Sequence, residues 1–274
     1  MDELARALEL DRRVVLRGGQ EAIEIPEGWV VLSSRLPDVY TLNMVVLAES
    51  MGDRFDAATL TALADRWLGH LGHRFVRVED PVLADRVWPE LERRGWQRSR
   101  TVFMVLRGAP AGAIADPRAR ELSGAELDIV TQANFEQYDF GSETSAELVR
   151  QLVAAQRTMR AGTSARGFGA GENSGLQSMC TLFLDGDVGG GRTAMIDEVG
   201  TLPSHRERGL AKAVVSAAIR AAREWGADLI VVPADADDWP QLLYAKLRFE
   251  PVGIQSSFTL RHATARGRAC ETAR

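Results

Sequence analysis

The sequence predicts an α/β protein made of two tandem modules in which strands alternate with helices. The chain has 274 residues, of which 45% are hydrophobic, so it has enough apolar material to bury a core. The order strand, helix, strand, helix, strand occurs in both halves, which indicates an internal duplication. Residues 228–232 are almost continuously apolar, as expected of a strand buried on both faces.

The first half begins with a predicted short helix and a turn at Gly18-Gly19, followed by two strand pieces within 21–34 around a Pro26-Glu27-Gly28 turn. A helix over 56–71 is indicated by the apolar stripe of Leu60, Leu63, Ala64, Trp67 and Leu71. The next helix should begin after Asp80-Pro81, bend or split at Pro89 and end before Gly95. Strands are expected at 40–47, 74–78 and 101–106.

A segment rich in alanine, proline and glycine, 108–119, is the expected linker to the second half. Helix 209–225 carries one apolar face and stops at Gly226, and Asp238 and Pro240 open a last helix that ends near Leu247. Asp237 or Asp238 is the expected cap of that helix. The remaining elements are expected as helices 123–134 and 145–161, a short strand within 161–175, and strands 176–184, 194–202, 228–232 and 253–260.

Composition excludes several classes of protein. A formal net charge of −5 without a basic block argues against nucleic acid as the main partner. Cys180 and Cys270 are the two cysteines, too few for a disulfide framework or a cysteine-based metal site. The acidic start lacks a signal-peptide pattern, and no apolar run approaches a membrane span. We therefore expect a cytoplasmic protein, with no nucleic-acid or membrane partner.

The segment that follows the strand ending at Pro203 has the features of an anion site. Arg206, Arg208 and Gly209 lie in a short loop that leads directly into a helix. The first N–H groups of a helix have no intrahelical partner, and the helix dipole adds positive charge there. Gly209 and Ala211 are small enough for the backbone to approach a phosphate. This loop therefore suits a pyrophosphate, although a plain turn with solvated arginines would have the same spacing.

The same residues carry a resemblance to a known family. Arg206-x-x-Gly209-x-Ala211 resembles the acetyl-CoA-binding pattern Q/R-x-x-G-x-G/A of the GNAT superfamily of N-acetyltransferases. Asp237 and the run Leu243–Phe249 are similar to the family's "N…LYxKxGF" segment, with Asp237 in place of Asn and Arg248 in place of Gly. The two motifs stand in the family's order, and the resemblance covers roughly residues 120–260.

The resemblance implies a GNAT-like mixed central sheet flanked by helices, with acetyl-CoA as co-substrate. Backbone at Val199–Leu202 would run along the pantetheine arm, and an N–H there would polarise the thioester carbonyl. The implied cofactor-binding residues are Val199, Gly200, Thr201, Leu202, Arg206, Glu207, Arg208, Gly209, Leu210, Ala211, Lys212 and Asp237. The implied domains are a degenerate GNAT-like module at 1–107, the linker at 108–119, an acetyl-CoA-binding catalytic module at 120–262 and a disordered tail at 263–274.

Two side chains carry the expected chemistry. Tyr244 would lie near the sulfur, where a phenol of pKa about 10 can donate a proton to a thiolate whose conjugate acid has a pKa of about 8.5. An alkylammonium acceptor, of pKa about 10, must first lose a proton, and Glu198 is the expected base. Asp197 or a chain of waters are the alternatives. Strand alternation predicts that Glu198 and Asp197 point to opposite faces.

The predicted activity is transfer of acetyl from acetyl-CoA to a primary amine of a small molecule, directly and in a ternary complex. No metal is expected, and the protein should be a monomer or a homodimer. A non-catalytic acyl-CoA sensor or scaffold, or a transferase that uses another acyl-CoA, are the alternatives. The first half lacks both motifs and would complete the sheet or wall the acceptor cleft.

Other features have plainer interpretations. The glycines of 167–171 lack the strand and helix context of a dinucleotide fingerprint, and His70 and His73 have no third ligand nearby in the sequence. Cys180, within an apolar strand, is expected to be a small buried hydrophobe. Trp239 is expected either to pack in the core or to line an acceptor pocket.

Overall fold

The computed structural model describes residues 2–48, 55–108, 115–137, 145–172 and 175–261. The chain divides into two compact units, each built from two separate stretches. Unit 1 consists of Met1–Gly18 and Thr101–Ile254, and unit 2 of Gly19–Arg100 and Gln255–Arg274. Two strands, β5 (Gln97–Leu106) and β11 (Phe249–Arg261), contribute residues to both units.

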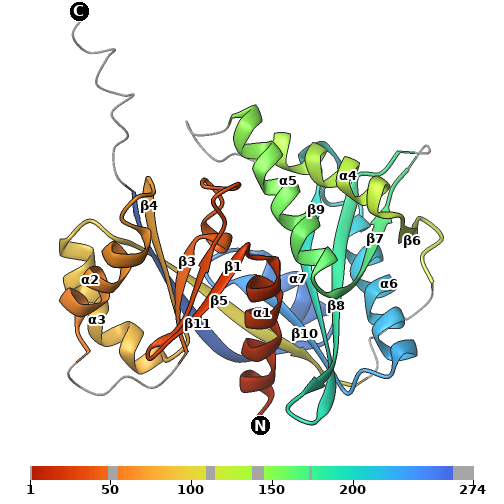
Figure 1. Cartoon of the computed structure of the whole chain (residues 1–274). Coiled ribbons are helices and arrows are strands. Elements are labelled where there is room, and N and C mark those ends of the chain that lie inside the picture. The colour runs from red at the N-terminus through yellow and green to blue at the C-terminus, as the bar shows by residue number, and fades with distance from the viewer. Residues whose placement is uncertain (1, 49–54, 109–114, 138–144, 173–174, 262–274) are drawn as a thin grey trace, which may run out of the picture. The chain divides into compact units, whose positions relative to one another are not determined.

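Unit 1 contains a mixed sheet with the strand order β11-β5-β10-β9-β8-β7-β6 (Figure 1). Strands β9 and β10 are parallel, whereas β10 is antiparallel to β5, and β8 is antiparallel to both β7 and β9. Strand β6 closes the edge antiparallel to β7. The strands introduced here are β6 (Ala119–Leu122), β7 (Ser164–Ala170), β8 (Ser178–Val188), β9 (Gly191–Thr201) and β10 (Leu229–Asp235).

Helices cover both faces of the unit 1 sheet, and alternate residues of each strand supply the two cores (Figure 1). Leu182, Ile196 and Val232 pack with helices α6 (Leu210–Trp225) and α7 (Pro240–Lys246). On the other face, Phe183 and Met195 pack with α1 (Glu3–Gly18), which in turn lies against α5 (Ala146–Ala161). Helix α4 (Gly124–Gln137) packs through Leu127 and Val130 against Met179 of β8.

Unit 2 repeats the same pairing pattern on a smaller scale. Its strands follow the order β1-β2-β3-β4-β11, with β3 parallel to β4 and β4 antiparallel to β11. Helices α2 (Ala57–Leu68) and α3 (Pro81–Arg93) pack with these strands in one core. The strands introduced here are β1 (Glu21–Ile25), β2 (Gly28–Leu32), β3 (Met44–Leu47) and β4 (His73–Val78).

Most predicted elements are present, and the predicted fold class, a mixed sheet flanked by helices, is confirmed. Asp80 caps α3 through the amides of Val82 and Leu83, and Gly226 ends α6 in a left-handed conformation, as expected. Cys180 is fully buried and its thiol contacts the carbonyl of Val214, which confirms the prediction of a small buried hydrophobe.

Several local predictions were wrong. The expected strand 40–47 begins only at Met44, because Tyr40–Leu42 forms a 3-10 turn held by the side chain of Asn43 on the carbonyls of Leu36 and Val39. Helix α3 runs unbroken through Pro89. Strand β6 lies partly in the segment expected to be the linker.

The expected cap of the last helix was also wrong. Helix α7 has Trp239 at its N-cap position without a side-chain cap, and Asp238 instead accepts the amide of Trp239. The expected tail at 263–274 lies outside the described residues, and so does half of the expected linker, residues 109–114. Among the described helices, none combines the length and apolarity needed to cross a membrane.

Candidate active site

Strands β9 and β10 pair over only a short stretch and then part. Their parallel register runs from Thr193 opposite Leu229 to Met195 opposite Val231. Beyond this point β9 continues to Thr201 along β8, while β10 continues to Asp235 along β5. The edge of β9 that faces away from β8 therefore has backbone groups without a strand partner in the described structure. An extended ligand with amide groups can pair with such an edge.

A β-bulge lies in β9 where the strands part. Thr181 is opposite Asp197 and Met179 is opposite Gly200, so three steps along β9 match two steps along β8. Glu198, within the bulge, has a φ of 56°, in the left-handed region that non-glycine residues rarely adopt. Such a conformation costs about 1 kcal/mol or more and persists only where the surroundings hold it in place.

The bulge overturns the predicted alternation of the two carboxylates. Asp197 lies directly opposite Thr181, so the two side chains share a face of the sheet. The Thr181 hydroxyl also donates to Oε2 of Glu198, at 2.5 Å, so Glu198 turns toward the same side. The left-handed φ of Glu198 breaks the alternation, because regular alternation holds only for extended residues.

Glu198 is the most strongly perturbed carboxyl among the described residues of this region. Its side chain is only 7% exposed, and its Oε1 atom is buried without a hydrogen-bond partner in the described part of the chain. Burial, and secondarily the charge of Asp197, raises the pKa of Glu198 to about 7. A carboxyl with this pKa can accept a proton near neutral pH. Its Oε1 atom, which accepts no hydrogen bond from the described residues, is available to receive that proton.

Arg160 connects Glu198 to helix α4. Its guanidinium lies 3.4 Å from Oε2 of Glu198 and 2.5 Å from Oδ1 of Asp128. Arg157, one turn earlier on α5, binds the same Asp128 at 2.7 Å. The positive charge of Arg160 acts against burial and lowers the pKa of Glu198. Asp128, Arg157 and Arg160 also line a cavity of about 360 Å³ between α4, α5 and β7.

Tyr244 lies on α7 and is buried, with 4% of its surface exposed. Its ring meets that of Phe249 edge-on, with 6.1 Å between the centroids. Burial, followed by the charges of Asp197 and Cys180, raises the pKa of Tyr244 well above its ordinary value. The phenol therefore stays protonated at physiological pH and can act as a proton donor. The structure brings Tyr244 within electrostatic range of Asp197, beside the bulge.

The loop between β9 and α6 is exposed and offers unpaired backbone amides. Residues 206–209 are all exposed, and Gly209 has a φ of 78° at the N-cap of α6. The first bond of the helix runs from the amide of Ala213 to the carbonyl of Gly209. The amides of residues 207–212 find no acceptor within the described ranges of the chain. Together with the helix dipole, these amides have the chemistry that an anion needs, so the sequence-based prediction of an anion site stays a prediction.

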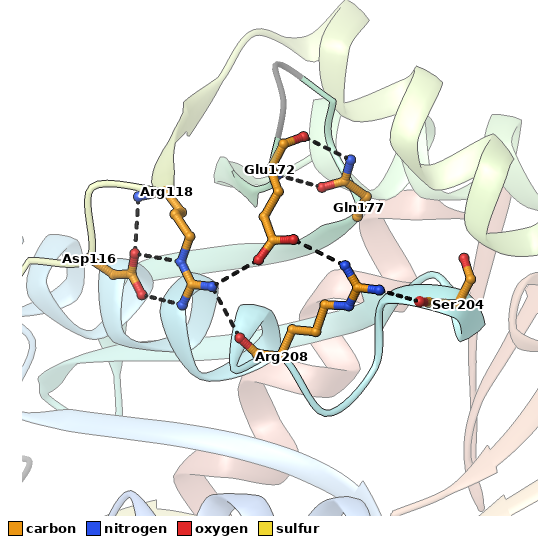
Figure 2. A network of polar contacts seen from close by, with 6 residues as sticks. All are labelled: Asp116, Arg118, Glu172, Gln177, Ser204 and Arg208. Carbon is orange, nitrogen blue, oxygen red and sulfur yellow. Dashed lines mark hydrogen bonds and ion pairs between the residues drawn. The ribbon is translucent and has the colours of Figure 1, made fainter.

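An arginine and carboxylate cluster borders this loop (Figure 2). Arg118 donates to the carbonyl of Arg208 at 3.1 Å and to Glu172 at 3.4 Å. Arg208 in turn donates to the other oxygen of Glu172 at 3.2 Å. Sequence reasoning missed Arg118, Glu172 and Arg160, because these contacts with Arg208 and Glu198 span 36 to 90 residues of sequence and leave no local pattern.

The remaining predicted residues take varied positions. Val199 packs against the core beside α6, and Gly200 lies against Asn134 of α4. The amide of Leu202 is bonded to the carbonyl of Gln177, so it is not available to a ligand. Asp237 lies in the exposed turn after β10, where its amide donates to Asp235. Trp239 is 53% exposed, so it does not pack in the core.

This mixed sheet flanked by helices, with its parting strands and its loop at the start of α6, matches GNAT-like folds. Residues 128–247 match the model of the acetyltransferase (GNAT) family. The general activity that this match supports is acyl transfer. A comparison with curated protein sequences found no match.

Solved structures show the same fold at low sequence identity. A GCN5-related N-acetyltransferase from Kribbella flavida has a TM-score of 0.64 at 18% identity, covering 97% of this chain and 99% of its own. A conserved protein of unknown function from Staphylococcus epidermidis has a TM-score of 0.65 at 13% identity, covering 89% and 94%. A GCN5-related N-acetyltransferase from Sphaerobacter thermophilus has a TM-score of 0.51 at 13% identity, covering 74% and 67%.

Proposed function

We propose that the protein transfers the acetyl group of acetyl-CoA to a primary amine of a small molecule. The observation that carries this proposal is the set of amides at residues 207–212 without an acceptor in the described part of the chain, in a loop exposed at 206–209, at the end of a strand whose edge has no strand partner there. The pyrophosphate would bind these amides, with Arg206 and Lys212 nearby. The pantetheine arm would lie along Val199–Thr201, in the gap where β9 leaves β10.

The proposed reaction is direct. The amine nitrogen attacks the thioester carbonyl carbon, the carbon–sulfur bond breaks, and the thiolate leaves as coenzyme A. Glu198, whose pKa of about 7 suits a base at neutral pH, takes the proton of the ammonium, directly or through a water at its unpartnered oxygen. Tyr244 gives a proton to the leaving thiolate, because burial keeps the phenol protonated. The second proton, which the nitrogen loses after the attack, passes to the phenolate and restores Tyr244.

Unit 2 is proposed to be a degenerate copy of the catalytic module. The support is the shared pairing pattern, in which a parallel pair is followed by an antiparallel strand in each unit: β3, β4 and β11 in unit 2, and β9, β10 and β5 in unit 1. Neither the arginine and glycine loop nor a counterpart of Tyr244 occurs in the first half of the sequence.

The experiment combines calorimetry with a CoA-release assay over a panel of primary amines. We expect acetyl-CoA to bind with 1:1 stoichiometry and at least one amine to release CoA. Tyr244→Phe should lower kcat by about 100-fold, within the usual range for a general acid, and leave the affinity for CoA unchanged. Binding without turnover on any amine would favour the acyl-CoA sensor, and an absence of binding would refute both functions.

A further inference from the structure

We propose that Arg118 is a positioning residue for the phosphate-binding loop, an inference that rests on the proposed function. Arg118 precedes β6 and lies before the region that matches the family model, residues 128–247. Its guanidinium reaches across 90 residues of sequence to the carbonyl of Arg208, at 3.1 Å. Figure 2 shows this contact and the carboxylates around it.

The contact fixes the orientation of one peptide group. A trans peptide is planar, so its carbonyl and its N–H point in opposite directions. The carbonyl of Arg208 belongs to the same peptide group as the amide of Gly209. Arg118 holds the carbonyl of Arg208 toward its guanidinium, so the amide N–H of Gly209 points away from Arg118. In this orientation the Gly209 amide can join the other unpaired amides of the loop in binding one anion.

The loop needs such a restraint because its backbone is strained. Glu207 has a φ of 64° and Gly209 a φ of 78°, so left-handed residues flank Arg208 on both sides. Glycine adopts this conformation freely, but Glu207 does not. Without an external hydrogen bond the loop would sample other conformations, and its amides would no longer converge on one anion.

Arg118 acts through its geometry rather than through its charge. Asp116 binds it with two parallel bonds, at 3.0 Å to Nε and 2.8 Å to Nη2, and Glu172 lies 3.4 Å from Nη1. These carboxylates offset its positive charge, and Arg118 lowers the pKa of Asp116 in return. The planar fork is what allows one side chain to bind Asp116 and the carbonyl of Arg208 together, and lysine cannot do this.

The test measures dissociation constants for coenzyme A and for pantetheine, which lacks the phosphates. Arg118→Gln should weaken CoA binding about tenfold, as expected for the loss of a charge-assisted hydrogen bond, and leave pantetheine binding unchanged. Arg118→Lys should weaken CoA binding as well. Arg120→Gln is the matched control, since Arg120 lies two residues on and binds Glu126 instead of the loop.

Three results would overturn the proposal: unchanged CoA affinity in Arg118→Gln, full affinity in Arg118→Lys, or an equal loss of pantetheine binding. The first result would mean that the contact between Arg118 and the loop does not affect binding. The second would mean that only the positive charge at this position matters, and the third that the substitution damages the fold in general. If the wild-type protein does not bind CoA, the proposed function fails. Inorganic pyrophosphate is then the probe, and weaker pyrophosphate binding by Arg118→Gln than by Arg120→Gln would still support the positioning role.

Discussion

At the scale of single residues, the candidate chemistry lies in a partly buried polar chain that begins at Asp128 and passes through Arg160 to Glu198 and Thr181. The sequence pointed to Tyr244 through its place in a motif, and to Glu198 through its place on the strand just before the other motif. It could not indicate Arg160 or Thr181, because their contacts depend on helix α5 and strand β8 meeting the bulge. It also misplaced Glu198 relative to Asp197, since a positive φ in a strand has no signature when the residue is glutamate.

Arg160 should set the pH dependence of the proposed reaction. Its charge and hydrogen bond lower the pKa of Glu198, so Arg160→Gln should raise that pKa above about 7. Because the base works only when ionised, the acidic limb of the kcat/KM profile should move to higher pH, by about one unit. The measurement is a pH profile from 5.5 to 9 with the best amine of the panel.

Arg157→Gln is the matched control for this change. Arg157 shares Asp128 with Arg160, but the structure gives it no contact with Glu198. Its variant should keep the profile of the wild-type protein. An acidic limb that stays in place in Arg160→Gln would mean that another group, such as Asp197, accepts the proton.

At the scale of elements, helix α6 shows what the sequence predicts well. Its apolar face and the stop at Gly226 were evident from the periodicity, and the glycine at its start indicated the anion loop. Strand β6 was missed because alanine, proline and glycine surround it, and the last helix was given the wrong cap because two aspartates precede its proline. In both places the local composition suggests one structure, whereas contacts with distant parts of the chain favour another. A single sequence does not reveal those distant contacts.

Substitutions at the two ends of α6 distinguish an effect on the stability of the protein from an effect on CoA binding. Gly209 and Gly226 both have positive φ, at 78° and 87°, so alanine at either position should lower the free energy of unfolding by about 1 kcal/mol. Only Gly209→Ala should also weaken CoA binding, because it alters the loop amides. Thermal denaturation and calorimetry on both variants check this. Equal CoA affinities in the two variants would contradict a phosphate site at the start of α6.

At the scale of the whole molecule, helix α1 is separated in the sequence from the unit that it completes. Ala7 and Leu8 bury apolar residues of β5 and β10, and Leu10 and Val14 bury those of β8 and β9. Ion pairs fasten the same helix, from Glu3 to Arg107 at 2.6 Å and from Arg13 to Asp185 at 3.2 Å. The repeated order of elements in the sequence placed α1 with the first half, whereas its contacts place it in unit 1.

Removal of α1 should therefore damage unit 1. Deletion of residues 1–18 should expose the apolar face of its sheet, increase binding of the dye ANS and weaken CoA binding. Leu10→Ala, at a side chain 1% exposed, is the milder form and should cost about 3 kcal/mol of stability. A deletion variant that melts like the wild-type protein would show that the helix adds nothing to this unit.

The way both units draw on distant stretches of chain has a consequence for biosynthesis. Helix α1 is translated before the rest of unit 1, and its partners on β8, β9 and β10 are translated after residue 177. Strand β4 likewise cannot pair with β11, its second neighbouring strand, until residues 256–261 have been translated. Neither unit can close before β11 has been made, so both units complete their folding only after that strand is translated. During that interval the apolar strands are exposed, which makes the nascent chain prone to aggregation.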